Sequence, residues 1–272
     1  LGTVLAGLVN LIVLFAFIIK KKLPFVLAVS SHFRWNRAFV GEYLQKCFPI
    51  LCNEVLIGIG NMMINIVLGH QSEQAIAAVA VFRTLEGLII AFFSGFSNAA
   101  TVLVGKEVGA GNHETAYQRA WRLIYLCSAL IGTACLVLFA VHNPLLHAMG
   151  LHDESYRIGT GMLMIYGIAA VIRMGNWVQN DTYRSAGDAA FGSIMEITFM
   201  YLLVLPCVYG ANYGLHAPFL LVFALCYVDE PIRYVIMQIH MYSAQWIKPV
   251  SDAGRATIDE FQKNHSPRHK KH

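Results

Sequence analysis

Acidic and amide side chains recur at helical spacing inside long apolar stretches of this sequence. Between residues 47 and 69, Glu54, Gly58 and Asn61 follow one another at steps of four and three residues, which places them on one helix face beside Asn53. A carboxylate among amides could bind a cation or a proton. A charged side chain at mid-membrane costs at least about 2.5–3.5 kcal/mol on insertion scales, so this face must meet protein or a water-filled cavity. We therefore expect Glu54 to have a functional role.

Two other apolar stretches repeat this pattern and should contribute to the same cavity. Residues 75–104 carry one acid about midway, and residues 158–183 carry amides one turn apart with further polar neighbours. Including the first stretch, the candidate ion- or substrate-binding residues are Asn53, Glu54, Asn61, Glu86, Asn176, Gln179, Asn180 and Asp181.

Not every charge in an apolar stretch needs a functional explanation. Asp229 and Glu230 precede Arg233 by four and three residues, so a structural ion pair is the favoured interpretation. Pro231 lies between them and should kink the helix.

Three other charged residues have simpler alternatives to function. Glu196 stands alone on its helix, and both a packing contact and a functional role remain open. Arg184 and Asp188 flank a short Ser-Ala-Gly turn, where a turn or capping role is favoured.

These residues must be positioned by membrane-spanning helices. The sequence has 272 residues, of which 57% are hydrophobic and 13% charged, whereas soluble domains carry about a quarter charged residues. A spanning helix needs about 20 mostly apolar residues. The stretches that meet or approach this length are Leu1–Ile19, Cys47–Gly69, Ala75–Val104, Ala120–Val141, Ile158–Tyr183, Ala189–Tyr209 and His216–Ile247. The expected fold is an all-α, polytopic transmembrane helix bundle.

Basic residues gather in alternate connections between these stretches. They are Lys20–Lys22, Arg34, Arg37, Lys106, Arg119, Arg122, Arg184, Lys248 and Arg255. The intervening connections carry almost none. Because positive charge is retained on the cytoplasmic side, we expect a multi-pass protein of the cell membrane (inner or plasma membrane) with a cytoplasmic C-terminus.

Other classes of function find no support in the sequence. The six cysteines lie within apolar stretches and form no C-x-x-C pair, so neither a disulfide framework nor a metal site is indicated. The net charge of +4 is modest and lies in loops and tail, which fits a membrane surface better than nucleic acid. Metalloprotease, nucleophile-elbow and phosphate-loop motifs are absent, so we expect no enzyme and no cofactor.

Three motifs stand out along the chain: Phe48-Pro-Ile-Leu-Cys-Asn-Glu54, Gly95-Phe-Ser-Asn-Ala-Ala100 running into Val104-Gly-Lys-Glu-Val-Gly-Ala-Gly111, and Tyr183-Arg-Ser-Ala-Gly-Asp188. In their order and separation they resemble the C-terminal half of the multidrug and toxic compound extrusion (MATE) family, within the MOP flippase superfamily. The resemblance covers about residues 40–248. It implies twelve helices in an inverted V of two six-helix lobes, and Glu54 and Glu86 match acidic positions of the family. Arg173 departs from it, since some members have an acidic residue there.

The resemblance also implies the organisation of the chain. Residues 1–19 would be the end of a preceding, truncated transmembrane helix, and 20–46 a cytoplasmic linker between lobes. Residues 47–248 would be the six-helix C-terminal lobe, and 249–272 a disordered cytoplasmic tail. The N-terminal lobe would be a missing partner.

The implied activity is secondary antiport, in which drugs, toxins or metabolites, cationic or amphipathic, leave in exchange for Na⁺ or H⁺. Two alternatives stay open. A lipid-linked oligosaccharide flippase would favour a cavity lined with arginines, and a membrane scaffold or receptor would transport nothing. The expected partners are a small-molecule substrate and the lipid bilayer, with no nucleic acid.

Overall fold

The computed structural model describes residues 2–20, 37–70, 72–249 and 251–265. The chain divides into two compact units, Leu1–Cys52 and Asn53–His272, which are described separately.

The first unit contains helix α1 (Gly2–Lys20) and the beginning of α4 (Arg37–Gly69). The apolar side chains along α1 are exposed, as the composition of a membrane helix leads one to expect. The linker predicted over 20–46 falls largely outside the described residues. From Arg37 onward the chain is already helical, so α4 begins ten residues before the predicted span at Cys47.

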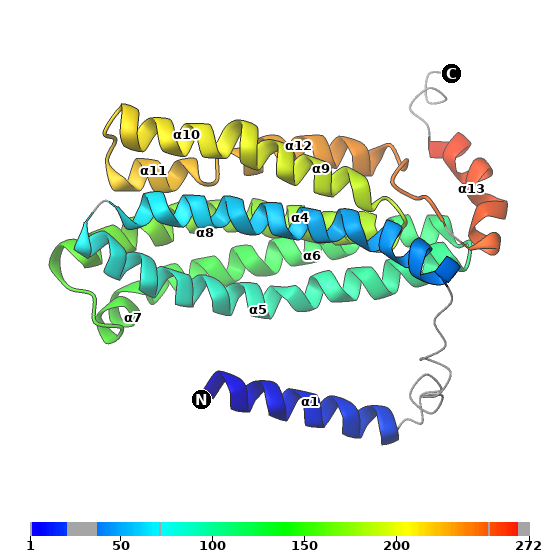
Figure 1. Ribbon diagram of the computed structural model, residues 1–272, viewed down its shortest axis with the longest axis horizontal. Coiled ribbons are helices and arrows are strands. Elements are labelled where there is room, and N and C mark those ends of the chain that lie inside the picture. The colour runs from blue at the N-terminus through cyan, green and yellow to red at the C-terminus, as the bar shows by residue number, and fades with distance from the viewer. Residues whose placement is uncertain (1, 21–36, 71, 250, 266–272) are drawn as a thin grey trace. The chain divides into compact units, whose positions relative to one another are not determined.

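The second unit, which includes the remainder of α4, is built from long helices and a few short ones (Figure 1). They are α5 (Glu73–Gly109), α6 (His113–Ala140), the short α7 (His142–Ala148), α8 (Asp153–Ser185), α9 (Ala189–Phe199), α10 (Leu205–Tyr209), α11 (Phe219–Leu225), α12 (Asp229–Tyr242) and α13 (Asp252–His265). Polar residues extend several of these helices past the predicted apolar limits. Ser72, for example, caps α5 by accepting a hydrogen bond from the Ala75 N–H at 3.1 Å.

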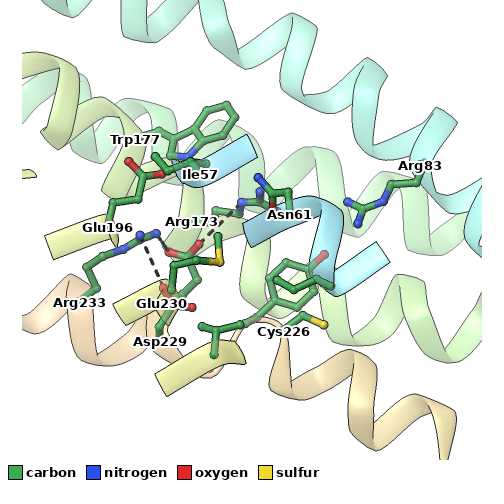
Figure 2. A pocket seen from close by; sticks show the side chains of 14 residues that line it. Ile57, Asn61, Arg83, Arg173, Trp177, Glu196, Cys226, Asp229, Glu230 and Arg233 are labelled. Atoms are coloured by element: carbon green, nitrogen blue, oxygen red, sulfur yellow. Dashed lines mark hydrogen bonds and ion pairs between the residues drawn. The ribbon is translucent and has the colours of Figure 1, made fainter. Parts of the chain in front are cut away.

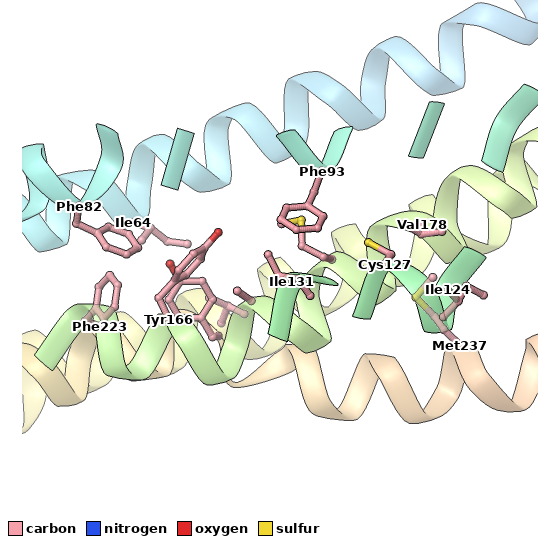
Figure 3. Close-up of a cluster of buried hydrophobic side chains, with 14 of the residues drawn as sticks. Ile64, Phe82, Phe93, Ile124, Cys127, Ile131, Tyr166, Val178, Phe223 and Met237 are labelled. Carbon is pink, nitrogen blue, oxygen red and sulfur yellow. The ribbon is translucent and has the colours of Figure 1, made fainter. Parts of the chain in front are cut away.

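Helix α8 is central, because it packs against α5, α6, α7, α9, α11 and α12. An aromatic group joins three of these helices: the Phe82 ring meets those of Tyr166 and Phe223 edge-on, each at 5.1 Å between centroids (Figure 3). This packing fixes where α8 lies among its neighbours, and with it the side chains on its other faces.

Large apolar side chains cover the outside of the helices, as lipid contact requires. Exposed examples are Leu88, Phe92, Leu136, Ile168 and Leu202. Five helical segments are long and apolar enough to cross a membrane: Leu51–Gly69, Glu73–Gly109, His113–Ala140, Asp153–Ser185 and Ala189–Gly214. The described residues form no strand. The all-α, multi-pass prediction is confirmed.

The fifth of these segments is not a regular helix. It passes from α9 into a π-helical turn, Met200–Val204, then α10, then a second π-helical turn, Gly210–Gly214. Pro206 has no N–H to give to the preceding turn, which accounts for part of this irregularity. The hydroxyl of Tyr201 donates to the Leu56 carbonyl at 2.8 Å and ties this segment to α4.

One prediction about the C-terminal part is wrong. The single span expected over His216–Ile247 is two helices, α11 and α12, separated at residues 226–228. The disturbance predicted at Pro231 is this break in the preceding turn, and Pro231 itself lies in the first turn of α12, where a missing N–H is tolerated.

The tail expected to be disordered over 249–272 forms helix α13 from Asp252 to His265, which packs on α5 and α6. Phe261 is buried there, and His113 Nε2 lies 2.9 Å from the Gly254 carbonyl oxygen. An aromatic anchor and polar contacts thus order a segment whose composition is hydrophilic.

Candidate functional site

One cavity in the second unit is dominated by carboxylates, and we call it the carboxylate cavity. It measures about 240 Å³ and is lined by Glu54, Ile57, Trp177, Asn180, Asp181, Arg184 and Glu196. With all side chains ionised, three acids face one arginine.

Arg184 is shared between two of these acids. Its Nη2 lies 3.6 Å from Glu54 Oε1, and its Nη1 lies 3.9 Å from Asp181 Oδ1. Asp181 also accepts a hydrogen bond from the Ser97 hydroxyl. No basic residue lies one helical turn from Glu54 in the sequence, but α8 brings Arg184 to it from far along the chain. The Glu54 side chain is nevertheless 59% exposed, so it remains free to meet a ligand.

Beside this cavity lies an ion-pair cluster, formed by Arg83, Glu86, Arg173, Asp229, Glu230 and Arg233. Glu86 is almost fully buried, with Arg83 Nη1 at 2.6 Å and Arg173 Nη1 at 2.8 Å from its two oxygens. Arg83 also donates to Asn65 Oδ1 at 2.8 Å. The carboxylate of this buried residue is thus held by two arginines.

The C-terminal side of the ion-pair cluster is equally well paired. Arg233 Nη2 lies 2.8 Å from Glu230 Oε2, and its Nη1 lies 3.5 Å from Asp229 Oδ2. Asn176 Nδ2 donates to the same Glu230 oxygen at 2.7 Å. The structural ion pair predicted for Asp229, Glu230 and Arg233 is confirmed. Three arginines and three acids balance in the cluster, so burial leaves no uncompensated charge.

A second cavity of about 100 Å³ borders the ion-pair cluster, and we call it the ion-pair cavity (Figure 2). Arg83 and Asn61 line it from one side, and Trp177 and Glu196 from the other. The Arg173 guanidinium lies over the Trp177 and Tyr227 rings, 5.6 and 5.5 Å from their centroids.

A third, small cavity of about 10 Å³ is lined by Asn176, Trp177, Asn180, Gly192, Glu196, Arg233 and Met237. Oδ1 of Asn176, Oδ1 of Asn180 and Nε of Arg233 have no hydrogen-bond partner within the described part of the chain. Glu196 lines all three cavities.

The predicted site residues do not all come together. Glu54, Asn180 and Asp181 share the carboxylate cavity, Asn61 lines the ion-pair cavity, and Asn176 lines the small cavity.

Asn53, Glu86 and Gln179 line none of these three cavities. Asn53 is 1% exposed, and its amide atoms have no partner among the described residues. Gln179 is fully buried and accepts a 3.5 Å hydrogen bond from the Tyr183 hydroxyl. The expectation that Glu86 and Gln179 line the cavity with Glu54 is therefore wrong. Successive residues on a helix point about 100° apart, so Gln179 faces away from the cavity that its neighbour Asn180 lines.

Sequence reasoning assigned Arg184 to a turn and left Glu196 undecided, although both face the carboxylate cavity. Trp177 was not considered. One signal was available for Glu196: Gly192 lies one turn before it on α9, and a small residue there lets another helix approach.

The turn between α8 and α9 is fixed by Asp188, which is 4% exposed and lies 2.9 Å from both His240 Nε2 and Lys248 Nζ. Burial by itself raises the pKa of Asp188, but the hydrogen bonds and charges of His240 and Lys248 outweigh it and lower the pKa below its ordinary value. Gly187 has φ +96°, and a Cβ there would collide with the Lys248 carbonyl oxygen. Asp188 thus holds the chain after α12 against this turn, rather than capping a helix.

No group of three or more His, Cys, Asp or Glu residues in the described ranges is placed to hold a metal ion. The chemistry available is binding of cations or protons by carboxylates, next to an aromatic ring.

Long apolar helices around a charged interior define a multi-pass membrane protein. The MatE family model matches residues 49–209, which is more than half of the sequence. The chain belongs to the MatE family, whose members are transporters.

One curated relative agrees with this assignment. The chain is 22% identical over 253 residues to the uncharacterized transporter YisQ of Bacillus subtilis, covering 91% of this chain and 54% of that protein. It therefore spans about half the length of this relative.

Solved structures share the fold at low sequence identity. An outward-facing multidrug resistance MATE family transporter of the MOP superfamily matches with TM-score 0.67 and 18% identity, over 75% of this chain and 45% of its own. A MATE protein in complex with MaD3S matches with TM-score 0.68 and 17% identity, over 75% and 46%. A MOP superfamily transporter from Pyrococcus furiosus, described as having a binding pocket of reverse polarity, matches with TM-score 0.67 and 16% identity, over 82% and 47%.

Proposed function

We propose that this chain forms the second six-helix lobe of a secondary antiporter, which exports cationic or amphipathic small molecules in exchange for Na⁺ or H⁺. It would work with another six-helix lobe in the cell membrane, with its C-terminus in the cytoplasm. The single observation that carries the proposal is the carboxylate cavity, where Glu54, Asp181 and Glu196 face one arginine.

The imbalance of charge in this cavity favours cations, because ionised carboxylates attract a positive ligand. Trp177, whose ring already lies beside the Arg173 guanidinium, also lines this cavity, and an aromatic ring face stabilises an organic cation by about 0.5–2 kcal/mol. A bound cation would also relieve repulsion between acids that a single Arg184 cannot neutralise.

Exchange follows if substrate and coupling ion compete for the same carboxylates. Glu54 and Asp181 share Arg184, so neither has a cation of its own. The coupling ion would bind an acid of this cavity in one state, and the substrate would bind Glu54 and Asp181 in the other, while rocking of one lobe against the other changes access.

The test is transport by the protein that carries this chain, reconstituted in proteoliposomes with an imposed Na⁺ or H⁺ gradient. We expect Glu54→Gln to abolish ion-driven flux of a fluorescent lipophilic cation. Glu154→Gln is the matched control, because Glu154 is also an exposed acid, paired with Arg157 at 3.1 Å on the same helix. Equal flux and equal ion dependence in Glu54→Gln and wild type would contradict the proposal. Absence of any ion-driven flux in wild type would favour a scaffold or receptor.

A second candidate substrate is an anionic lipid-linked headgroup, favoured by Arg83, Arg173 and Arg233 around the ion-pair cavity. Each of these arginines is already paired with an acid of the ion-pair cluster, which weakens this candidate. It predicts that an anionic substrate, and not a cation, competes in the same flux assay.

A further inference from the structure

Glu196 occupies a unique position among the acids of the described interior, because it borders the carboxylate, ion-pair and small cavities alike. The two larger cavities, of about 240 and 100 Å³, have room for water molecules. A proton carried by water can therefore reach Glu196 from either of them.

Glu196 also differs from its neighbours in its partners. Each other acid lining these cavities has an arginine nitrogen within 4.0 Å. For Glu196, no ion pair within that distance occurs in the parts of the chain that the structure describes. Its hydrogen bond comes instead from the neutral Asn180 amide, whose Nδ2 lies 3.4 Å from Glu196 Oε2.

The small cavity supplies an independent observation. Asn176 is 2% exposed, and its Oδ1 lacks a donor among the described residues, as does Oδ1 of Asn180. An ionised carboxylate cannot donate to these oxygens, whereas a protonated one has an O–H that can. Protonation of Glu196 would thus provide a donor for one of these two buried acceptors, and Asn180 is the residue already in contact with Glu196.

The Asn180 amide can form a hydrogen bond with Glu196 in both its ionised and its protonated form. The amide offers Nδ2 to the carboxylate, and rotation of the same amide would offer Oδ1 to the protonated form. Gly192 permits this arrangement, because a Cβ at that position would collide with Asn180 Oδ1.

Charged groups face the Glu196 region from the helices around it. They are Glu54 on α4, Arg83 on α5, Arg173, Asp181 and Arg184 on α8, and Asp229, Glu230 and Arg233 on α12. Arg233 also lines the small cavity, and its positive charge disfavours a metal cation there.

From this geometry we propose that Glu196 binds the coupling proton, with Asn180 as its hydrogen-bond partner. The carboxylate takes the proton from water in one cavity and returns it to water in the other, so that no charge is left behind. The inference rests on the proposed antiport and selects H⁺ as the ion.

Infrared difference spectra of the purified protein at two pH values test protonation directly, without transport. We expect a C=O stretching band of a protonated carboxyl group in wild type, absent in Glu196→Gln and retained in Glu154→Gln. Persistence of the band in Glu196→Gln would overturn the assignment. If Glu196→Gln does not fold, Glu196→Asp gives the same answer, because the band should remain at a shifted frequency; an unshifted band would contradict the proposal.

The partner is tested with Asn180→Leu, which fills similar space and has no amide. The C=O band should move to higher frequency as the acid loses its hydrogen bond, and an unmoved band would reject Asn180 as the partner. Glu54→Gln should keep the band. A band that depends on Glu196, combined with no flux in wild type, would support the proton site while contradicting the antiporter.

Discussion

The carboxylate cavity and the ion-pair cluster lie side by side, and both bring charges into the interior of the membrane-spanning helices. In the ion-pair cluster, Glu86 and Glu230 are each held by two arginines at distances of 2.6–3.7 Å. In the carboxylate cavity, Glu54 and Asp181 share Arg184 at 3.6 and 3.9 Å. The first arrangement satisfies its charges, and the second leaves acids short of positive partners.

The difference shows that depth in the membrane alone does not mark a functional charge. A buried acid with complete partners stabilises one arrangement of helices, whereas an acid with incomplete partners can bind an ion or substrate. Substitutions in the cluster should therefore lower stability, whereas substitutions in the cavity should weaken ligand binding.

Removal of an arginine from the cluster should have the largest effect. We expect Arg233→Met to lower the free energy of unfolding by about 3–5 kcal/mol, because it leaves Asp229 buried without a cation and leaves Glu230 with only Arg173, at 3.7 Å. Thermal unfolding in detergent measures this. Arg157→Met is the control, since that arginine is 79% exposed and its pair contributes only about 0–1 kcal/mol. Equal melting temperatures for Arg233→Met and Arg157→Met would show that the ion-pair cluster does not stabilise the fold, which would contradict the comparison.

An intermediate effect is expected at the turn between α8 and α9. Asp188→Asn should cost about 1–3 kcal/mol at neutral pH, because it weakens the contacts to His240 and Lys248. The pKa of Asp188 is lowered in the folded protein, so its stabilisation is complete above the unfolded pKa of about 3.9 and is lost as pH falls through the folded value.

Unfolding curves at several pH values test this direction of the pH dependence. The gap in melting temperature between wild type and Asp188→Asn should close in acid, below about pH 4. A gap that is constant or widens in acid would show that the ionised carboxylate is not what stabilises the turn.

The smallest effect on stability should come from the carboxylate cavity. Glu54→Gln should change the free energy of unfolding by no more than about 0.5 kcal/mol, because the side chain is 59% exposed and its arginine is 3.6 Å away. The same unfolding measurement checks this. A loss comparable to that of Arg233→Met would place Glu54 among the structural charges.

Much of the fold could be predicted from the sequence, because lipid imposes long apolar helices. Helix ends were less predictable. The polar residues that extend α5 and α8 beyond the apolar stretches have no apolar signature, and Pro231 could not be assigned to a first turn without the break at residues 226–228. Order in α13 depends on contacts such as that of Phe261, which composition does not reveal.

For the candidate site, sequence spacing identified polar helix faces but not which helices meet. Asp229, Glu230 and Arg233 are neighbours on one helix, so their pairing was predictable. The approach of Arg184 to Glu54 joins residues 130 positions apart and required the tertiary structure. The same holds for Glu196, whose importance follows from the three cavities it borders.

The central claim is that the carboxylate cavity binds a cationic ligand through Glu54. Equilibrium binding of radiolabelled tetraphenylphosphonium to the purified protein tests it most directly, with Glu154→Gln as the control. We predict that Glu54→Gln raises Kd by about tenfold or more, since loss of a charged contact costs about 1.5–3 kcal/mol. An unchanged Kd in Glu54→Gln, with wild type binding well, would contradict the claim.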